Sequence, residues 1–153
     1  MVKANYFDIK ELVPRHVHDA RGEKAWELID SRLIAAIDAI RENHGPAIVN
    51  TWAYPKYAEQ YGRRNWSGLR TAEFYRKQGF TDIQMYKAFE RSYSQHKFGR
   101  AVDMLFVTAS VDDVREDILS NPEKYPTIKA VELGTSWLHI DVRNCNAIKT
   151  FYP

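Results

Sequence analysis

The stretch Ala101-Val102-Asp103-Met104-Leu105-Phe106-Val107 is the most informative part of the sequence for the fold. Its apolar residues barely alternate with polar ones, which predicts a strand that is covered on both faces. Asp103 is the exception. A carboxylate in such a strand needs a cation, either an arginine or a metal ion, because an unpaired buried charge costs several kcal/mol. Both the sheet and the chemistry of the protein are therefore expected to centre on this strand.

The chain that follows this strand predicts one helix and one hairpin. Ser110 is in the position of an N-cap, and Asn121-Pro122 ends the helix that it begins. Two short strands are expected over 128–133 and 137–142, separated by Gly134-Thr135, which is a hairpin signal.

The chain that precedes this strand predicts helices and a further strand. Apolar residues recur at helical spacing over 23–43, and Asp30-Ser31 offers an N-cap inside that run, so two helices should meet there. His44-Gly45-Pro46 ends the second helix, and a short strand is expected over 47–52. Because helices and strands do not alternate regularly, the expected class is α+β, with a small antiparallel central sheet flanked by helices.

Length and composition limit the possible classes of protein. The 153 residues match one domain, and 44% hydrophobic residues can fill its core, which excludes wholesale disorder. A net charge of +2 is too small for a protein that binds polyanions over its whole surface. The single cysteine, Cys145, excludes an internal disulfide and a multi-cysteine zinc cluster. The first residues lack an apolar signal segment, so we expect synthesis in the cytoplasm without a signal peptide and no membrane insertion.

Residues 52–98 differ from the rest of the chain. They hold 12 of the 20 aromatic residues, and nine Lys/Arg against four Asp/Glu make this segment +5. We expect an irregular, aromatic surface that contains one helix over 82–91, whose inward residues would be Ile83, Met85, Tyr86 and Phe89.

His139 is the second unusual residue, because it lies in the expected strand Trp137-Leu138-His139-Ile140-Asp141-Val142. Alternation places Trp137, His139 and Asp141 on one face of that strand and the apolar residues on the other. A tight turn over 133–136 would set Glu132 opposite Trp137, on the face that carries His139.

His96 precedes Asp103 by seven residues, and Gly99 between them allows a sharp turn, so the two side chains could converge on one ion. With His139 they make a set of two nitrogen ligands and one oxygen ligand, which can hold a catalytic zinc and leave a position for water. Glu132 or Asp141 could deprotonate that water. By spacing alone, a core histidine and an ion-paired aspartate explain the same residues.

Three blocks of sequence resemble one known family. Ser94-Gln95-His96-Lys97-Phe98-Gly99-Arg100-Ala101-Val102-Asp103 fills every fixed position of the SxHxxGxAxD signature of the zinc D-Ala-D-Ala carboxypeptidase and L-alanyl-D-glutamate endopeptidase family, the hedgehog-like peptidases. Trp137-Leu138-His139-Ile140-Asp141 resembles its second block. Ser67-Gly68-Leu69-Arg70-Thr71-Ala72-Glu73-Phe74 resembles the stretch that carries its substrate-clamping arginine.

The resemblance implies one hedgehog-like peptidase domain over 1–153, with motif blocks at 67–74, 94–103 and 132–141. It implies one Zn²⁺ per chain on His96, Asp103 and His139, with Arg70 holding a substrate carboxylate or carbonyl. Many members place the acidic base three residues before the last histidine, where this chain has Ser136. Glu132 is therefore the expected base, and Asp141 is the second choice, better suited to orienting a ligand.

The expected function is a zinc peptidase that hydrolyses the stem peptides of bacterial peptidoglycan, as a D,D-carboxypeptidase or an endopeptidase. The size and the missing export signal resemble phage lysis or virion-associated enzymes that act on the cell wall, and a bacterial cytoplasmic dipeptidase is also compatible. The alternative is a catalytically degenerate, zinc-containing module that only binds the wall. Single-stranded nucleic acid binding by the +5 segment ranks last, since it leaves the three ligands unexplained. The oligomeric state is left open.

Overall fold

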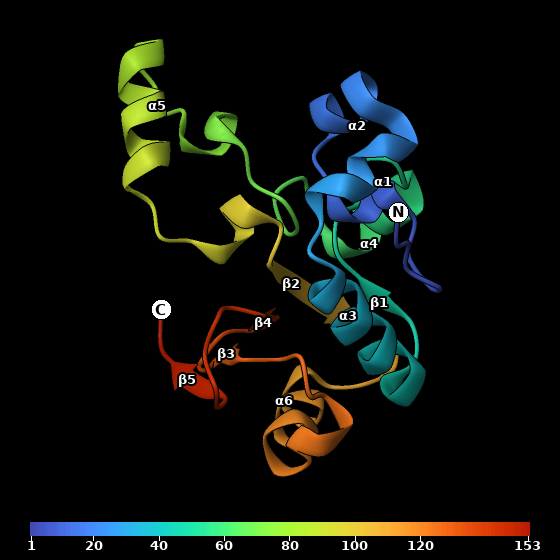
Figure 1. Cartoon of the computed structure of the whole chain (residues 1–153). Helices are drawn as coiled ribbons and strands as arrows, with labels where there is room; N and C mark the ends of the chain where they lie inside the picture. Colours follow the sequence, from blue (N-terminus) through green and yellow to red (C-terminus); the bar gives the residue numbers. More distant parts are fainter.

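The structure is a computed structural model that describes all 153 residues, and it has the expected α+β class. Figure 1 shows a small sheet with α3 and α6 beside it, α1, α2 and α4 grouped at one end, and α5 standing apart. In chain order the elements are α1 (Ile9–Leu12), α2 (Arg15–Arg21), the 3-10 helix η1 (Gly22–Leu28), α3 (Ser31–His44), β1 (Ala47–Ile48), α4 (Pro55–Tyr61), η2 (Ala72–Tyr75), α5 (Asp82–Arg91), η3 (Gln95–Phe98), β2 (Ala101–Phe106), α6 (Val111–Ser120), η4 (Pro122–Lys124), β3 (Ala130–Glu132), β4 (Leu138–Asp141) and β5 (Lys149–Phe151).

The five strands form one sheet in the order β1-β2-β4-β3-β5. Three of the four neighbouring pairs are antiparallel, as expected for the central sheet, whereas β3 and β5 pair in parallel at one edge. The physical reason is that β2 already covers the other edge of β4. The chain that leaves β4 turns back and pairs with the free edge of β3, which it meets in the same direction.

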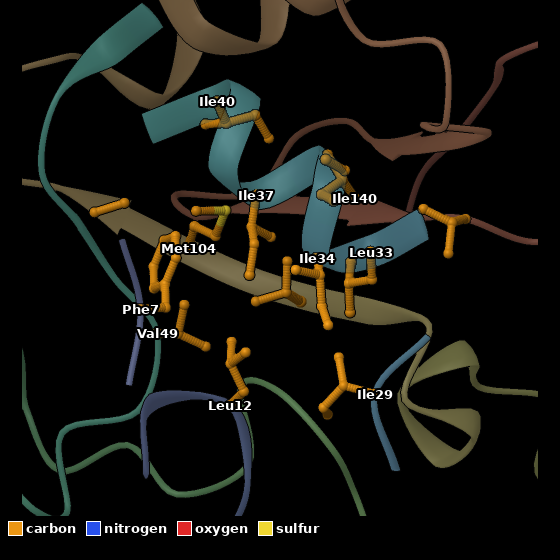
Figure 2. Close-up of a cluster of buried hydrophobic side chains, with 14 of the residues drawn as sticks. Phe7, Leu12, Ile29, Leu33, Ile34, Ile37, Ile40, Val49, Met104 and Ile140 are labelled. Atoms are coloured by element: carbon orange, nitrogen blue, oxygen red, sulfur yellow. The ribbon is translucent and has the colours of Figure 1, made fainter. Parts of the chain in front are cut away.

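The hydrophobic core lies between α3 and one face of the sheet. Figure 2 shows Ile34 and Ile37 of α3 next to Met104 of β2. Val102, Met104 and Phe106 of β2 and Leu138 and Ile140 of β4 all belong to this cluster of 27 buried residues. Burying one such side chain stabilises the fold by about 1.5–3 kcal/mol. The face of the sheet that packs on α3 is therefore the structural face, and the other face is available for polar residues.

The helix that follows Asp30 forms as expected. Asp30 is the N-cap of α3, and its carboxylate accepts from the Arg32 backbone N–H at 3.0 Å. The segment before it, η1, is a 3-10 helix. Ser110 caps α6 by accepting from the Asp113 backbone N–H, also as expected.

The strand expected over 47–52 is shorter than predicted. Only Ala47 and Ile48 pair with β2. The backbone N–H groups of Asn50 and Thr51 donate instead to the carbonyls of Glu11 and Arg64, at 3.0 and 2.9 Å. Contacts with an N-terminal helix and a distant loop thus replace the sheet, and local residue types carry no signal for such contacts.

The expected helix over 82–91 is present as α5, but its inward residues are only partly correct. Met85 is buried, whereas Ile83 is 68% exposed and Tyr86 is 55% exposed. Figure 1 shows α5 standing away from the sheet. Because α5 packs mainly against η2 and not against the core, it buries a narrower stripe than its apolar residues predict. The rest of 52–98 is also less irregular than expected, since it forms α4, η2 and η3.

Candidate metal centre

The face of the sheet opposite α3 carries the polar residues. The register of β2 and β4 sets Asp103 directly opposite His139. Both side chains are buried, and so is Asp141, two residues farther along β4 on the same face. The alternation predicted for β4 is confirmed, because Leu138, Ile140 and Val142 belong to the hydrophobic core.

Three side chains converge on this face and could hold a metal ion. His139 Nδ1 lies 2.7 Å from Asp103 Oδ1. His96 Nε2 lies 3.3 Å from His139 Nδ1 and 3.3 Å from the same oxygen of Asp103. Ligand atoms at about 2.0–2.1 Å from a tetrahedral zinc stand roughly 3.3–3.4 Å apart. The two longer separations match that spacing, so the ligand set fits a small tetrahedral cation with little movement.

His96 reaches the cluster through a tight turn. It lies in η3, and Gly99 ends η3 in the left-handed conformation, at φ 63° and ψ 28°, before β2 begins. A side chain at Gly99 would also collide with the Leu28 carbonyl. The turn expected at Gly99 is confirmed, and it brings His96 and Asp103 together despite the six residues between them.

The orientation of His96 is set by a backbone carbonyl. Its Nδ1 lies 2.8 Å from the carbonyl oxygen of Gly68 and donates to it, which leaves the lone pair of Nε2 directed at the cluster. Gly68 approaches the N-terminal helices so closely that a Cβ there would lie 2.2 Å from the Leu12 carbonyl oxygen. Sequence reasoning placed Gly68 in a motif block and missed this role.

His139 is supported from the other side by Asp141. The Nε2 atom of His139 lies 3.5 Å from Asp141 Oδ2, a long contact. Arg143 donates to both carboxylate oxygens of Asp141, at 2.8 and 2.5 Å, and its backbone N–H donates to Oδ1 at 3.1 Å. A fully buried carboxylate held by three donors is suited to orienting a ligand and poorly placed to move a proton. The role of Arg143 was not expected, although its two-residue spacing from Asp141 was visible in the sequence.

The charges of the three ligands differ. Burial lowers the pKa of His96 and keeps that imidazole neutral. Burial also opposes protonation of His139, yet its contacts with Asp103 and Asp141 outweigh burial and raise its pKa to about 9. Burial disfavours the charged form of Asp103, but the hydrogen bond from His139 Nδ1, at 2.7 Å, outweighs burial and lowers the pKa of Asp103. Without a metal, a protonated His139 and the guanidinium of Arg70 therefore provide the positive charge that the buried Asp103 needs.

Arg70 also contacts Asp103. Its Nη2 donates to Asp103 Oδ2 at 2.9 Å, and its Nε donates to the Trp66 carbonyl at 2.9 Å. The guanidinium lies over the Phe74 ring, 4.3 Å from its centre. The sequence predicts that Arg70 faces a substrate, and the structure places it beside the candidate metal centre, where it donates to the possible ligand Asp103.

A cavity of about 300 Å³ opens over the cluster. Glu132 and Trp137 line it, beside Arg70 and the three ligand candidates. The expected pairing of Glu132 with Trp137 is wrong by two residues, because Ala130 lies opposite Asp141 and Val131 opposite Ile140. A shift of the strand register by two residues keeps each side chain on the same face of the sheet, so Glu132 still lies on the face that carries His139. The Glu132 carboxylate forms no ion pair within the chain, while its backbone carbonyl accepts from Arg115.

The unexpected strand β5 completes the cavity. Phe151 of β5 lines it and packs edge-on against His139, with the ring centres 5.6 Å apart. Tyr93 and Ser94, which precede η3, and Gln95, its first residue, also line the cavity. The strand could not be foreseen from a residue pattern only three residues long.

Comparisons with known proteins found no matching family model, no matching curated protein and no matching solved structure. No helix has the length and apolar character that crossing a bilayer requires.

Proposed function

We propose that this protein is a zinc-dependent peptidase. The observation that carries the proposal is the convergence of His96 Nε2, His139 Nδ1 and Asp103 Oδ1, with an unpaired Glu132 beside them in one cavity. Structural zinc sites are normally closed by four protein ligands, whereas catalytic sites use three and leave a position open. A set of three ligands facing a cavity favours the catalytic kind.

A bound Zn²⁺ would polarise a carbonyl and lower the pKa of water to about 7. Glu132 then serves as the general base, which accepts a proton from water and passes it to the leaving amine. Arg70 steadies a substrate carbonyl or carboxylate at the cavity wall, and Asp141 keeps the His139 ring in place.

The proposed substrates are the stem peptides of bacterial peptidoglycan, with cleavage as a D,D-carboxypeptidase or an endopeptidase. The resemblance of the three motif blocks to the hedgehog-like peptidases supports this choice. The local charge of +5 over 52–98 also suits an acidic wall polymer. The proposal includes action on the cell wall as a phage lysis or virion-associated enzyme.

The experiment combines zinc content with cleavage of isolated peptidoglycan, and it compares the wild type with Glu132→Gln and Glu116→Gln. Glu116 is exposed on α6, so its variant is the matched control. We expect one zinc per chain in all three proteins. Peptide release, followed by mass spectrometry of new amino termini, should fall by about 10²–10⁴-fold only in Glu132→Gln.

Other outcomes identify the alternatives. If the protein contains zinc but releases no peptides from peptidoglycans of several chemistries, it is a zinc-containing module that only binds the wall. Absence of zinc would contradict the metal centre itself. Full activity in Glu132→Gln would mean that another residue of the cavity acts as the general base.

A further inference from the structure

A second and larger cavity, of about 630 Å³, lies between the N-terminal helices and the loop that follows α4. Three arginines line it, Arg15, Arg63 and Arg64, and Glu59 is the only acidic residue among its lining residues. The formal charge of the lining is therefore +2. No residue of the metal centre lines this cavity, and neither the motif blocks nor the proposed peptidase activity uses it.

Arg64 is the half-buried anchor of this cavity. Its Nε donates to the Val49 carbonyl at 2.8 Å, and its Nη2 donates to the Asp103 carbonyl at 3.0 Å. These two bonds leave three of its five N–H donors unused. Both partners are neutral carbonyls, and the guanidinium forms no ion pair within the chain. Burial lowers the pKa of Arg64, and the charge of Asp103 opposes that effect.

The other two arginines are also free to bind. Arg63 is exposed and forms no ion pair. Arg15 has only a loose surface contact with Asp19, at 3.6 Å between exposed side chains. Such a contact contributes little, because water screens it.

The walls of the cavity are held together before any ligand arrives. The Thr51 backbone N–H donates to the Arg64 carbonyl at 2.9 Å, and the Arg64 backbone N–H donates to the Thr51 hydroxyl at 2.9 Å. The Arg15 backbone N–H donates to Asn65 Oδ1 at 3.0 Å, which joins α2 to the same loop. A ligand would therefore meet a cavity whose backbone is already in place, and mainly the exposed side chains of Arg15 and Arg63 would need to be ordered.

We infer that this cavity is a phosphate-binding site in which Arg64, Arg63 and Arg15 hold the oxygens of a phosphate group. Guanidinium groups match phosphate oxygens with paired hydrogen bonds. The +2 lining complements a doubly charged phosphate better than a singly charged carboxylate. The phosphate is either free or carried on a small polyol, and both sources share this chemistry. The site shares no lining residue with the cavity over the candidate metal centre, although Arg64 bonds the backbone carbonyl of Asp103.

The test titrates the full chain, as purified, with inorganic phosphate, glycerol 3-phosphate and acetate at constant ionic strength. Calorimetry gives the affinities, and amide NMR shifts locate the site. We expect both phosphates to bind, acetate to bind at least tenfold more weakly, and shifts at Thr51, Arg63 and Arg64. Tighter binding of inorganic phosphate would identify the free ion as the ligand, and tighter binding of glycerol 3-phosphate would identify a phosphate carried on a polyol.

The variants Arg15→Glu and Arg63→Glu should each weaken phosphate binding by tenfold or more. Lys87→Glu on the exposed side of α5 makes the same change in charge far from the cavity and should alter it less than twofold. Equal weakening by all three would indicate nonspecific attraction and overturn the inference. Shifts confined to the metal centre, or no binding of either phosphate, would overturn it as well. None of these readouts requires zinc or peptidase activity, so the two proposals fail separately.

Discussion

Arg70 and the two histidines contact different oxygens of the Asp103 carboxylate. Arg70 Nη2 donates to Oδ2 at 2.9 Å, whereas Oδ1 lies 2.7 Å from His139 Nδ1 and 3.3 Å from His96 Nε2. One oxygen is thus directed at the candidate metal position and the other is held by a cation. These contacts on both oxygens fix the orientation of the carboxylate.

Arg70→Ala should retain one zinc per chain and lose peptidase activity. A hydrogen bond to a charged group contributes about 1.5–3 kcal/mol, which corresponds to roughly 10–150-fold in kcat/KM. Zinc analysis and cleavage of isolated peptidoglycan measure the two effects. Arg76→Ala is the control, because Arg76 pairs only with Glu73 and Asp82 on the exposed surface. Wild-type activity in Arg70→Ala would remove Arg70 from the proposed machinery.

Asp141→Asn should weaken zinc binding, because the amide supports His139 less well and leaves Arg143 without its charge partner. Loss of such an outer carboxylate costs about 10–100-fold in metal affinity. Competition with a coloured chelator measures the change. Asp113→Asn, on the exposed first turn of α6, should bind zinc like the wild type. An unchanged affinity in Asp141→Asn would show that the 3.5 Å contact does not support the ligand.

Gly99→Ala should destabilise the fold by more than about 2 kcal/mol. A left-handed backbone costs a side-chain-bearing residue about 1–2 kcal/mol, and a Cβ there would also lie 1.9 Å from the Leu28 carbonyl oxygen. Gly79 has a positive φ of 79° with no atom within 4 Å, so Gly79→Ala isolates the conformational cost. Urea unfolding of both variants measures the difference. Equal losses would mean that the backbone near Leu28 moves aside without cost.

Asp30 should make stability depend on pH. Hydrogen bonds from Arg32 lower the pKa of Asp30 to about 2, against about 3.9 in an unfolded chain. The ionised form therefore contributes about 2 kcal/mol that is fully present above pH 4 and is lost as the pH falls towards 2.

Asp30→Asn tests this contribution, because asparagine also serves as an N-cap and preserves α3. The variant should be less stable than the wild type at pH 7, and the difference should shrink at pH 2.5. Urea unfolding at the two pH values provides the comparison. If the difference in unfolding free energy between variant and wild type is the same at both pH values, Asp30 acts through capping alone.

The amino-acid sequence alone was sufficient to predict the features that depend on residues close together along the chain. Caps and turns, such as Asp30 before α3 and Gly99 before β2, depend on bonds between residues a few positions apart. Alternation along one strand likewise placed His139 and Asp141 on the same face. The anomaly of Asp103 in an apolar strand could be recognised because burying a charge is costly wherever it occurs.

Only the tertiary structure determined how these segments lie relative to one another. The register that sets Asp103 opposite His139 depends on the pairing of two strands separated by more than 30 residues, and no local pattern encodes it. The same holds for the bond from Arg70 to Asp103, the support of His96 by Gly68, and the parallel pairing of β5 with β3. Local preferences determine which element each segment forms, while the metal centre depends on distances between segments that only packing of the core establishes.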